Sequence, residues 1–153
     1  LNKPSFVNTK KNLFDESKWT IRGVESGRNV LIVNGYTTMG TPIPEMGSNV
    51  PVITEGFQPN TRYTISGKAK KTQYWTAILV TYTDGSYLKV DMPDNYVPWS
   101  YTTVAGKTVK WINLETGSPS ALGYIEEGTF QIEEGIVATP YTPYRLVSKQ
   151  AKR

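Results

Sequence analysis

Aromatic and polar side chains suited to sugar binding are concentrated between residues 73 and 101. Sugars present apolar C–H faces and rings of hydroxyl groups, so a site for them combines an aromatic platform with groups that donate and accept hydrogen bonds. From this segment and one preceding loop residue we select seven candidate carbohydrate-binding residues: Trp75, Tyr82, Asp84, Tyr87, Trp99, Tyr101 and Tyr36.

The candidate aromatics also have a structural interpretation. Tyr82 and Tyr87 flank Asp84-Gly85, so they are also expected as an ordinary cross-strand aromatic pair. Trp99 follows a Pro-containing loop, where an aromatic ring is less easily buried, and this favours binding. Three other large aromatics are predicted to lie in the core: Trp19, Tyr63 and Trp111.

Catalysis is not expected from this composition. The chain has no His and no Cys, which removes the commonest general base and any thiolate nucleophile. A glycosidase or polysaccharide lyase would use paired carboxylates, about 5 to 9.5 Å apart in a glycosidase. Glu126-Glu127 and Glu133-Glu134 are sequence neighbours, so on a strand their side chains point to opposite faces. Three further acids fit turns and solubility better: Asp84, Asp91 and Asp94.

No metal or cofactor is assigned. Asp15, Glu16, Glu126 and Glu127 offer oxygen ligands of the kind that calcium uses. Their spacing matches no calcium motif, so a structural calcium ion stays an open alternative.

The net charge of +4 arises in the C-terminal tail. Residues 145–153 hold four of the 17 basic residues and no acid, which leaves 13 basic and 13 acidic residues elsewhere. A neutral body without a basic stripe disfavours nucleic acid. No run approaches the roughly 18 apolar residues of a membrane span, so no membrane insertion is expected.

These side chains must be positioned by strands, because Thr, Val and Tyr are frequent and no segment keeps a helical apolar period. Asp84-Gly85 predicts a hairpin with a type I′ turn. We therefore predict one all-β domain, a two-sheet antiparallel β-sandwich with the topology of a jelly roll. The expected strands cover residues 19–24, 29–33, 50–54, 62–69, 75–83, 86–92, 99–104, 108–115 and 128–134.

The expected strand at residues 75–83 is apolar on both faces between Ala77 and Val80. Both of its faces should therefore be covered. The long Gly- and Pro-rich loop at residues 34–49 is the expected roof or groove wall over one of them.

Three segments together resemble a known family. Asn12-Leu13-Phe14 followed by Trp19 is similar to an opening motif, and residues 57–70 are similar to a "Tyr-Thr-Leu-Ser-x-x-Ala-Lys" strand. Residues 130–144 are similar to the closing signature "Gln-Leu-Glu-x-Gly-x-x-Ala-Thr-Pro-Tyr-x-Pro-Tyr". The chain thus resembles the carbohydrate-binding modules of bacteriophage tail and baseplate proteins.

That resemblance implies a jelly-roll module at residues 12–144, with linkers at 1–11 and 145–153. Such modules are inserted in or appended to distal tail proteins, baseplate accessory proteins and tail fibres. The implied function is non-catalytic adhesion of the virion tail or baseplate to host cell-surface polysaccharide, with the parent tail protein as the other partner. The segment 124–129 departs from the Asp-containing strand of relatives, which weakens the transfer of a calcium site. The alternative function is a structural or protein-docking module of the tail, because Tyr and Trp are also enriched at protein interfaces.

Overall fold

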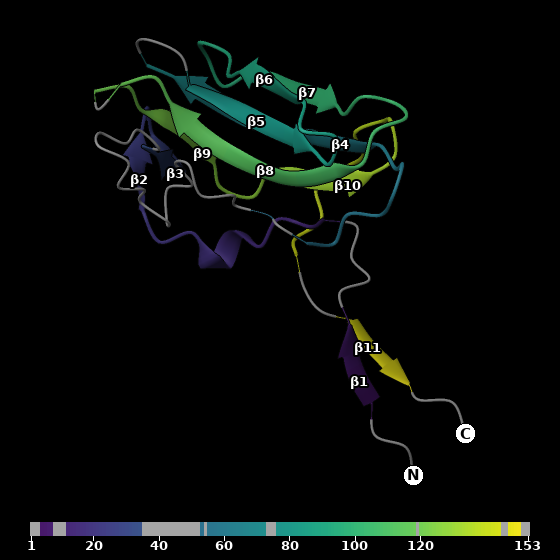
Figure 1. Ribbon diagram of the computed structural model, residues 1–153. Coiled ribbons are helices and arrows are strands. Elements are labelled where there is room, and N and C mark those ends of the chain that lie inside the picture. The colour runs from purple at the N-terminus through teal and green to yellow at the C-terminus, as the bar shows by residue number, and fades with distance from the viewer. Residues whose placement is uncertain are drawn as a thin grey trace.

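The computed structural model describes residues 4–7, 12–34, 53, 55–72, 76–118, 120–144 and 147–150. The chain is all-β, and two antiparallel sheets pack against each other as a sandwich (Figure 1). The described elements are β1 (Pro4–Val7), η1 (Glu16–Lys18), β2 (Arg22–Glu25), β3 (Arg28–Val33), β4 (Tyr63–Lys71), β5 (Thr76–Tyr82), β6 (Tyr87–Asp91), β7 (Pro98–Thr102), β8 (Val109–Thr116), β9 (Gly123–Glu126), β10 (Gln131–Glu134) and β11 (Val147–Gln150).

The larger sheet is built around the long strand β4. β10 pairs with its first half and β9 with its last three residues, while β7 pairs with Thr64–Lys68. Because β7 and β10 overlap along β4, they lie on its opposite edges. β9 also pairs with β3, and β3 pairs with β2, so this sheet runs from β7 to β2.

The sequence predicted one strand at residues 128–134. The structure begins this strand later, as β10, and adds β9, which was not predicted; residues 127–130 form a bulge between the two strands. Thr129 stabilises the bulge: its hydroxyl donates to the Glu126 carbonyl at 2.7 Å and accepts from the Lys68 N–H at 3.1 Å. Gly128 adopts a φ of 74°, which favours glycine. The bulge therefore bridges the gap along β4 between β9 and β10.

The smaller sheet has the order β6-β5-β8, and the β5–β6 hairpin is the one that Asp84-Gly85 predicts. The predicted type I′ turn is wrong. The Gly85 N–H donates to the Tyr82 carbonyl, Gly85 has a φ of 87°, and Asp84 is not among the residues with positive φ. This is a three-residue loop in which only the glycine is left-handed.

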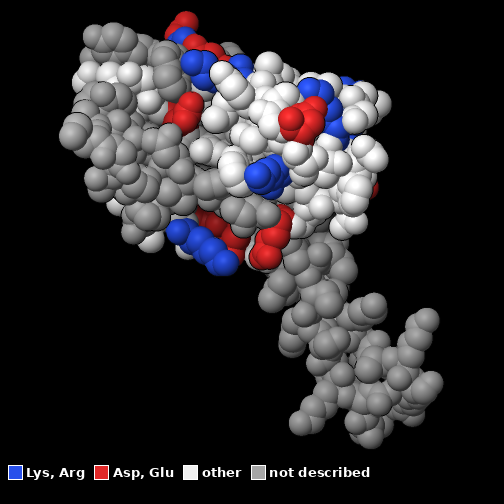
Figure 2. Space-filling model, in the orientation of Figure 1, with Lys and Arg blue, Asp and Glu red and all other residues white. Residues whose placement is uncertain are grey.

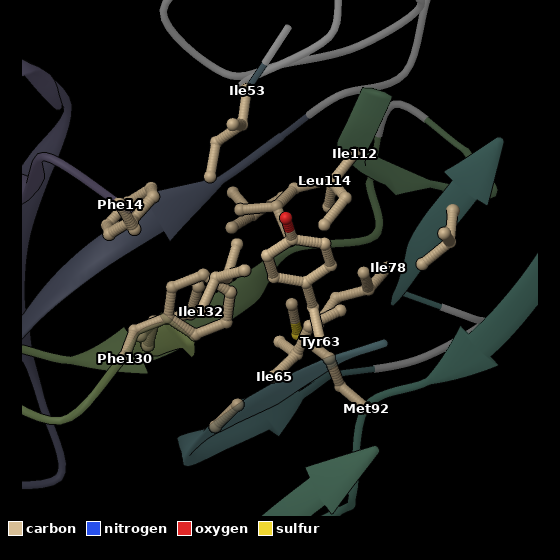
Figure 3. Packing of buried hydrophobic residues seen from close by; sticks show 14 of the residues in the cluster. Phe14, Ile53, Tyr63, Ile65, Ile78, Met92, Ile112, Leu114, Phe130 and Ile132 are labelled. Carbon is tan, nitrogen blue, oxygen red and sulfur yellow. The ribbon is translucent and has the colours of Figure 1, made fainter. Parts of the chain in front are cut away.

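The core lies between the sheets, and Figure 3 shows Tyr63 among apolar side chains from both. The Tyr63 hydroxyl accepts a 2.6 Å hydrogen bond from the Gln58 N–H, so its polar end is satisfied. The predicted burial of Trp19 and Tyr63 is confirmed. The predicted burial of Trp111 is wrong: it lies opposite Thr81 on the outer face of the smaller sheet and is only partly buried.

Strand β5 is buried on both faces at Ala77, Ile78 and Val80, as its apolar run predicts. The loop expected to cover it, together with its candidate Tyr36, lies almost wholly outside the described residues.

The two terminal segments expected as linkers contain strands. β1 and β11 pair antiparallel over four residues, from Pro4 opposite Gln150 to Val7 opposite Val147. Figure 1 shows this two-stranded ribbon projecting from the sandwich, with both chain ends at its far end.

Candidate functional site

An open groove of about 460 Å³ lies on the outer face of the larger sheet. Parts of β4 and β7, the bulge after β9 and the segment after β10 form it. We take it as the candidate site because it is concave and all of its lining residues are described. These residues are Ser66, Gly67, Lys68, Pro98, Trp99, Ser100, Gly128, Thr129, Ala138, Thr139, Pro140 and Tyr141.

The floor of the groove follows from the register of β4 and β7. Ser66 lies opposite Ser100, and Lys68 lies opposite Pro98. Ile65 and Ala69 are buried in the core, so the alternation of a strand turns Ser66 and Lys68 outward. The floor thus carries two hydroxyl groups and one ammonium group.

One wall is the extended segment 138–141, which two buried polar side chains of β10 hold against the sheet. The Gln131 amide donates to the Thr139 carbonyl at 3.2 Å and accepts from the Thr142 N–H at 2.8 Å. The Glu133 carboxylate accepts from the Thr139 N–H at 3.2 Å and from its hydroxyl at 2.6 Å. The closing sequence therefore has a structural role: its Gln and Glu position the wall.

Glu16 joins this wall to the bulge. Its carboxylate accepts hydrogen bonds from the Gly128 N–H, at 3.0 and 3.2 Å, and from the Tyr141 hydroxyl at 3.1 Å. Burial and the nearby Glu16 carboxylate raise the pKa of Tyr141 to about 12. The short helix η1, capped by the Asp15 side chain, places Glu16 at this position.

A network of charges lies on the same outer face, around Tyr96. The Tyr96 hydroxyl donates to the Glu25 carboxylate at 2.7 Å, and the Arg28 guanidinium lies 4.6 Å from the ring centre. Lys70 binds Glu25 at 2.7 Å, and hydrogen bonds from Lys70 and Tyr96 lower the pKa of Glu25 to about 2. Arg28 also pairs with Glu126. Tyr96 is buried, so this network fixes the loop before β7 on the sheet.

Among the described candidates, Trp99 belongs to the lining residues of the groove. It lies opposite Gly67 and its side chain packs inward against the core, so it is not a platform that stands in the groove. Tyr101, two residues further along β7, is partly buried on the inward face beside Tyr82. Burial, and to a lesser extent a hydrogen bond to Tyr82, raises the pKa of Tyr101 to about 12. The Tyr82 ring is buried and its hydroxyl accepts from the Val104 N–H at 3.0 Å, so this ring belongs to the core.

Asp84 and Tyr87 lie at the β5–β6 hairpin, on the other sheet. Tyr87 is 69% exposed and lies opposite Thr81, so it faces away from Tyr82 and the two do not form a cross-strand pair. Hydrogen bonds from Ser86, with Lys107 nearby, lower the pKa of Asp84 to about 2. Trp75, the remaining candidate, lies outside the described residues.

A second aromatic surface exists on the outer face of the smaller sheet. Trp111 and Tyr87 flank Thr81 in one cross-strand row. In the next outward row, Asn113 is buried and its side-chain oxygen has no hydrogen-bond partner among the residues that the structure describes. The charges of the surface are mixed: on the face shown in Figure 2, most Lys and Arg side chains (blue) lie beside Asp or Glu side chains (red), and no continuous basic stripe is visible there.

Sequence reasoning missed the floor residues Ser66, Lys68 and Ser100, and the wall residue Tyr141. The signal for the floor was the alternation of polar and buried residues along β4. Tyr141 was visible only as part of the closing motif.

Comparison with known proteins found no matching family model, no matching curated protein and no matching solved structure. Within the described residues, no group of three or more acidic side chains is arranged to hold a metal ion. No helix in the same part of the chain is long and apolar enough to cross a membrane.

Proposed function

We propose that this chain is a saccharide-binding module and that the groove over β4 and β7 is its binding site. The observation that carries the proposal is the composition of the groove. Pro98, Pro140 and Tyr141 supply apolar surface, while Ser66 and Ser100 supply hydroxyls on the floor. A concave, mainly apolar site with a few polar groups is the general form of a small-ligand site, and it matches the two-sided chemistry of a sugar.

The wider setting of the proposal comes from the sequence resemblance. The segment at residues 130–144 resembles the closing signature of phage tail and baseplate modules, and its residues build a wall of the groove. We therefore place the module, as a jelly roll, in a phage tail or baseplate protein, where it binds host cell-surface polysaccharide without catalysis.

A variant that fills the groove tests this proposal without removing any native contact. Ser100 is exposed, and its hydroxyl bonds to no other described side chain, so Ser100→Tyr adds bulk at the floor. Trp111→Ala is the matched variant on the outer face of the smaller sheet. A fluorescent fusion of each variant is incubated with host cells, with and without purified wall polysaccharide, after its thermal unfolding has been compared with that of the unmodified module.

We expect polysaccharide-sensitive labelling that Ser100→Tyr abolishes and Trp111→Ala retains. The reverse pattern would move the site to the smaller sheet and overturn the groove assignment. An unmodified fusion that labels no susceptible strain would overturn adhesion and favour the structural module of the tail.

A further inference from the structure

We propose that the groove selects saccharides that carry an anionic group, and that the Lys68 ammonium binds this group. The inference rests on the proposed saccharide site and names the class of sugar that the site takes. Its basis is the charge of the groove rather than its shape.

Lys68 differs from the other lysines of β4. Lys70 binds Glu25 at 2.7 Å and Lys71 binds Asp91 at 2.6 Å. Lys68 is half-buried, and its ammonium group forms no ion pair or hydrogen bond with any residue of the described ranges. A partly buried cation without a counter-ion favours an external anion.

The carboxylates beside the groove are already engaged. Glu133 accepts hydrogen bonds from Gln131 and Thr139, and Glu16 accepts from Gly128 and Tyr141. Glu126 pairs with Arg28. Glu16 and Glu133 keep their charges, but none of these three acids forms an ion pair with Lys68, so the ammonium group has no counter-ion among the described residues.

Hydroxyl groups lie within reach of the same anion. The Ser66 and Ser100 hydroxyls bond to no other side chain in the described part of the chain, and the two residues are direct cross-strand neighbours. Their Cβ atoms are therefore about 5 Å apart. Lys68 lies two residues along β4 from Ser66, so the Cα atoms of the two residues are about 7 Å apart. One oxyanion can thus accept a charge-assisted bond from Lys68 and a further bond from a serine.

The ammonium group is a compact charge that donates three hydrogen bonds, so it binds a phosphate or a carboxylate equally well. The shared chemistry is an anionic substituent on a sugar chain. Two kinds of sugar chain carry such an anionic group, phosphodiester-linked polymers and uronic-acid polymers, and the experiment distinguishes between them.

Calorimetric titration of the full chain with three polysaccharides tests the inference: a phosphodiester-linked polymer, a uronic-acid polymer and a neutral polymer of similar length. Lys68→Gln is compared with Lys110→Gln, which removes the same charge from the smaller sheet. Each variant is first checked for unchanged thermal unfolding. We expect Lys68→Gln to weaken binding of an anionic polymer by about tenfold or more, as loss of a charge-assisted bond predicts, and Lys110→Gln to leave it unchanged.

The polymer whose affinity falls identifies the anionic group. If the neutral polymer binds as tightly as the anionic ones and Lys68→Gln changes nothing, the anionic inference is wrong while saccharide binding stands. If Ser100→Tyr abolishes binding of the neutral polymer alone, the groove binds sugars but Lys68 is not their ligand. If none of the three polymers and no host-cell polysaccharide binds, the proposed function fails as well.

Discussion

Trp99 lies directly opposite Gly67, on the inward face of the larger sheet. A Cβ atom at position 67 would lie 3.1 Å from the Phe130 Cα and 3.3 Å from the Thr129 carbonyl oxygen. Gly67 thus lets the bulge approach β4 closely. Since the bulge lines the groove at Gly128 and Thr129, the shape of the groove depends on this glycine.

Gly67→Ala is expected to destabilise the module by about 1 to 3 kcal/mol, because the added methyl group meets the backbone of the bulge. Urea unfolding measures the change in the free energy of unfolding. Ser100→Ala, at an exposed position of the neighbouring strand, should change it by less than about 0.5 kcal/mol. Equal stabilities of the two variants would contradict the close approach.

Asn12→Ala should cost at least about 2 kcal/mol of unfolding free energy, because Asn12 is fully buried and satisfies four backbone groups. Its side-chain oxygen accepts from the N–H groups of Phe14 and Ile132, and its amide donates to the carbonyls of Phe130 and Thr142. Asn12→Asp keeps the acceptors but loses both donors, so at neutral pH this variant should also be less stable than the unmodified protein. Thermal unfolding of both variants checks this, and full stability of Asn12→Asp would show that the two donated bonds contribute nothing.

Glu25 should make the stability of the module sensitive to acid. Its pKa is about 2 in the folded protein against an ordinary value of 4.5, so the unfolded chain binds the proton more readily. The stabilisation from ionised Glu25 is present above pH 4.5 and is lost as the pH falls through about 2. Unfolding free energies measured across this range should therefore fall more steeply for the unmodified protein than for Glu25→Gln. Parallel curves would refute the contribution of Glu25, since Asp84 titrates alike in both proteins.

Glu16→Ala should loosen the join between the bulge and the wall of the groove. The Gly128 N–H loses its carboxylate acceptor, so its hydrogen exchange should accelerate several-fold, as loss of about 1 kcal/mol predicts. Exchange measured by nuclear magnetic resonance checks this. Glu134→Ala removes an exposed acid of β10 as the control and should leave the Gly128 amide unchanged. An unchanged rate in Glu16→Ala would mean that Glu16 does not hold the bulge.

The sandwich and its main strands could be predicted from the sequence, because the alternation of apolar and polar residues and the turn residues act locally. The β5–β6 hairpin is an example: Gly85 marked the turn, although the turn type depended on the φ of Asp84. Strand β9 was missed and β10 was predicted to begin at residue 128, because the bulge between them depends on Thr129 bonding to Lys68, which is far away in the sequence.

The candidate site was less accessible to sequence reasoning. Tyr82 was selected for its chemistry but turns inward, and Trp111 was predicted to lie in the core but turns outward, since the strand register decides which face a side chain joins. The groove depends on the return of residues 138–141 across β4 and β7. That return is set by the buried Gln131 and Glu133, whose bonds to Thr139 and Thr142 no local pattern reveals.

The antiparallel ribbon of β1 and β11 has a mechanical consequence. Because Pro4 and Gln150 are neighbours, a force that draws these two residues apart acts across the ribbon and opens its hydrogen bonds one pair at a time, as a zipper opens. Such a load peels four residue pairs before it reaches the sandwich. A tension applied at the far ends would thus unfasten the ribbon first, with the shape of the groove still intact.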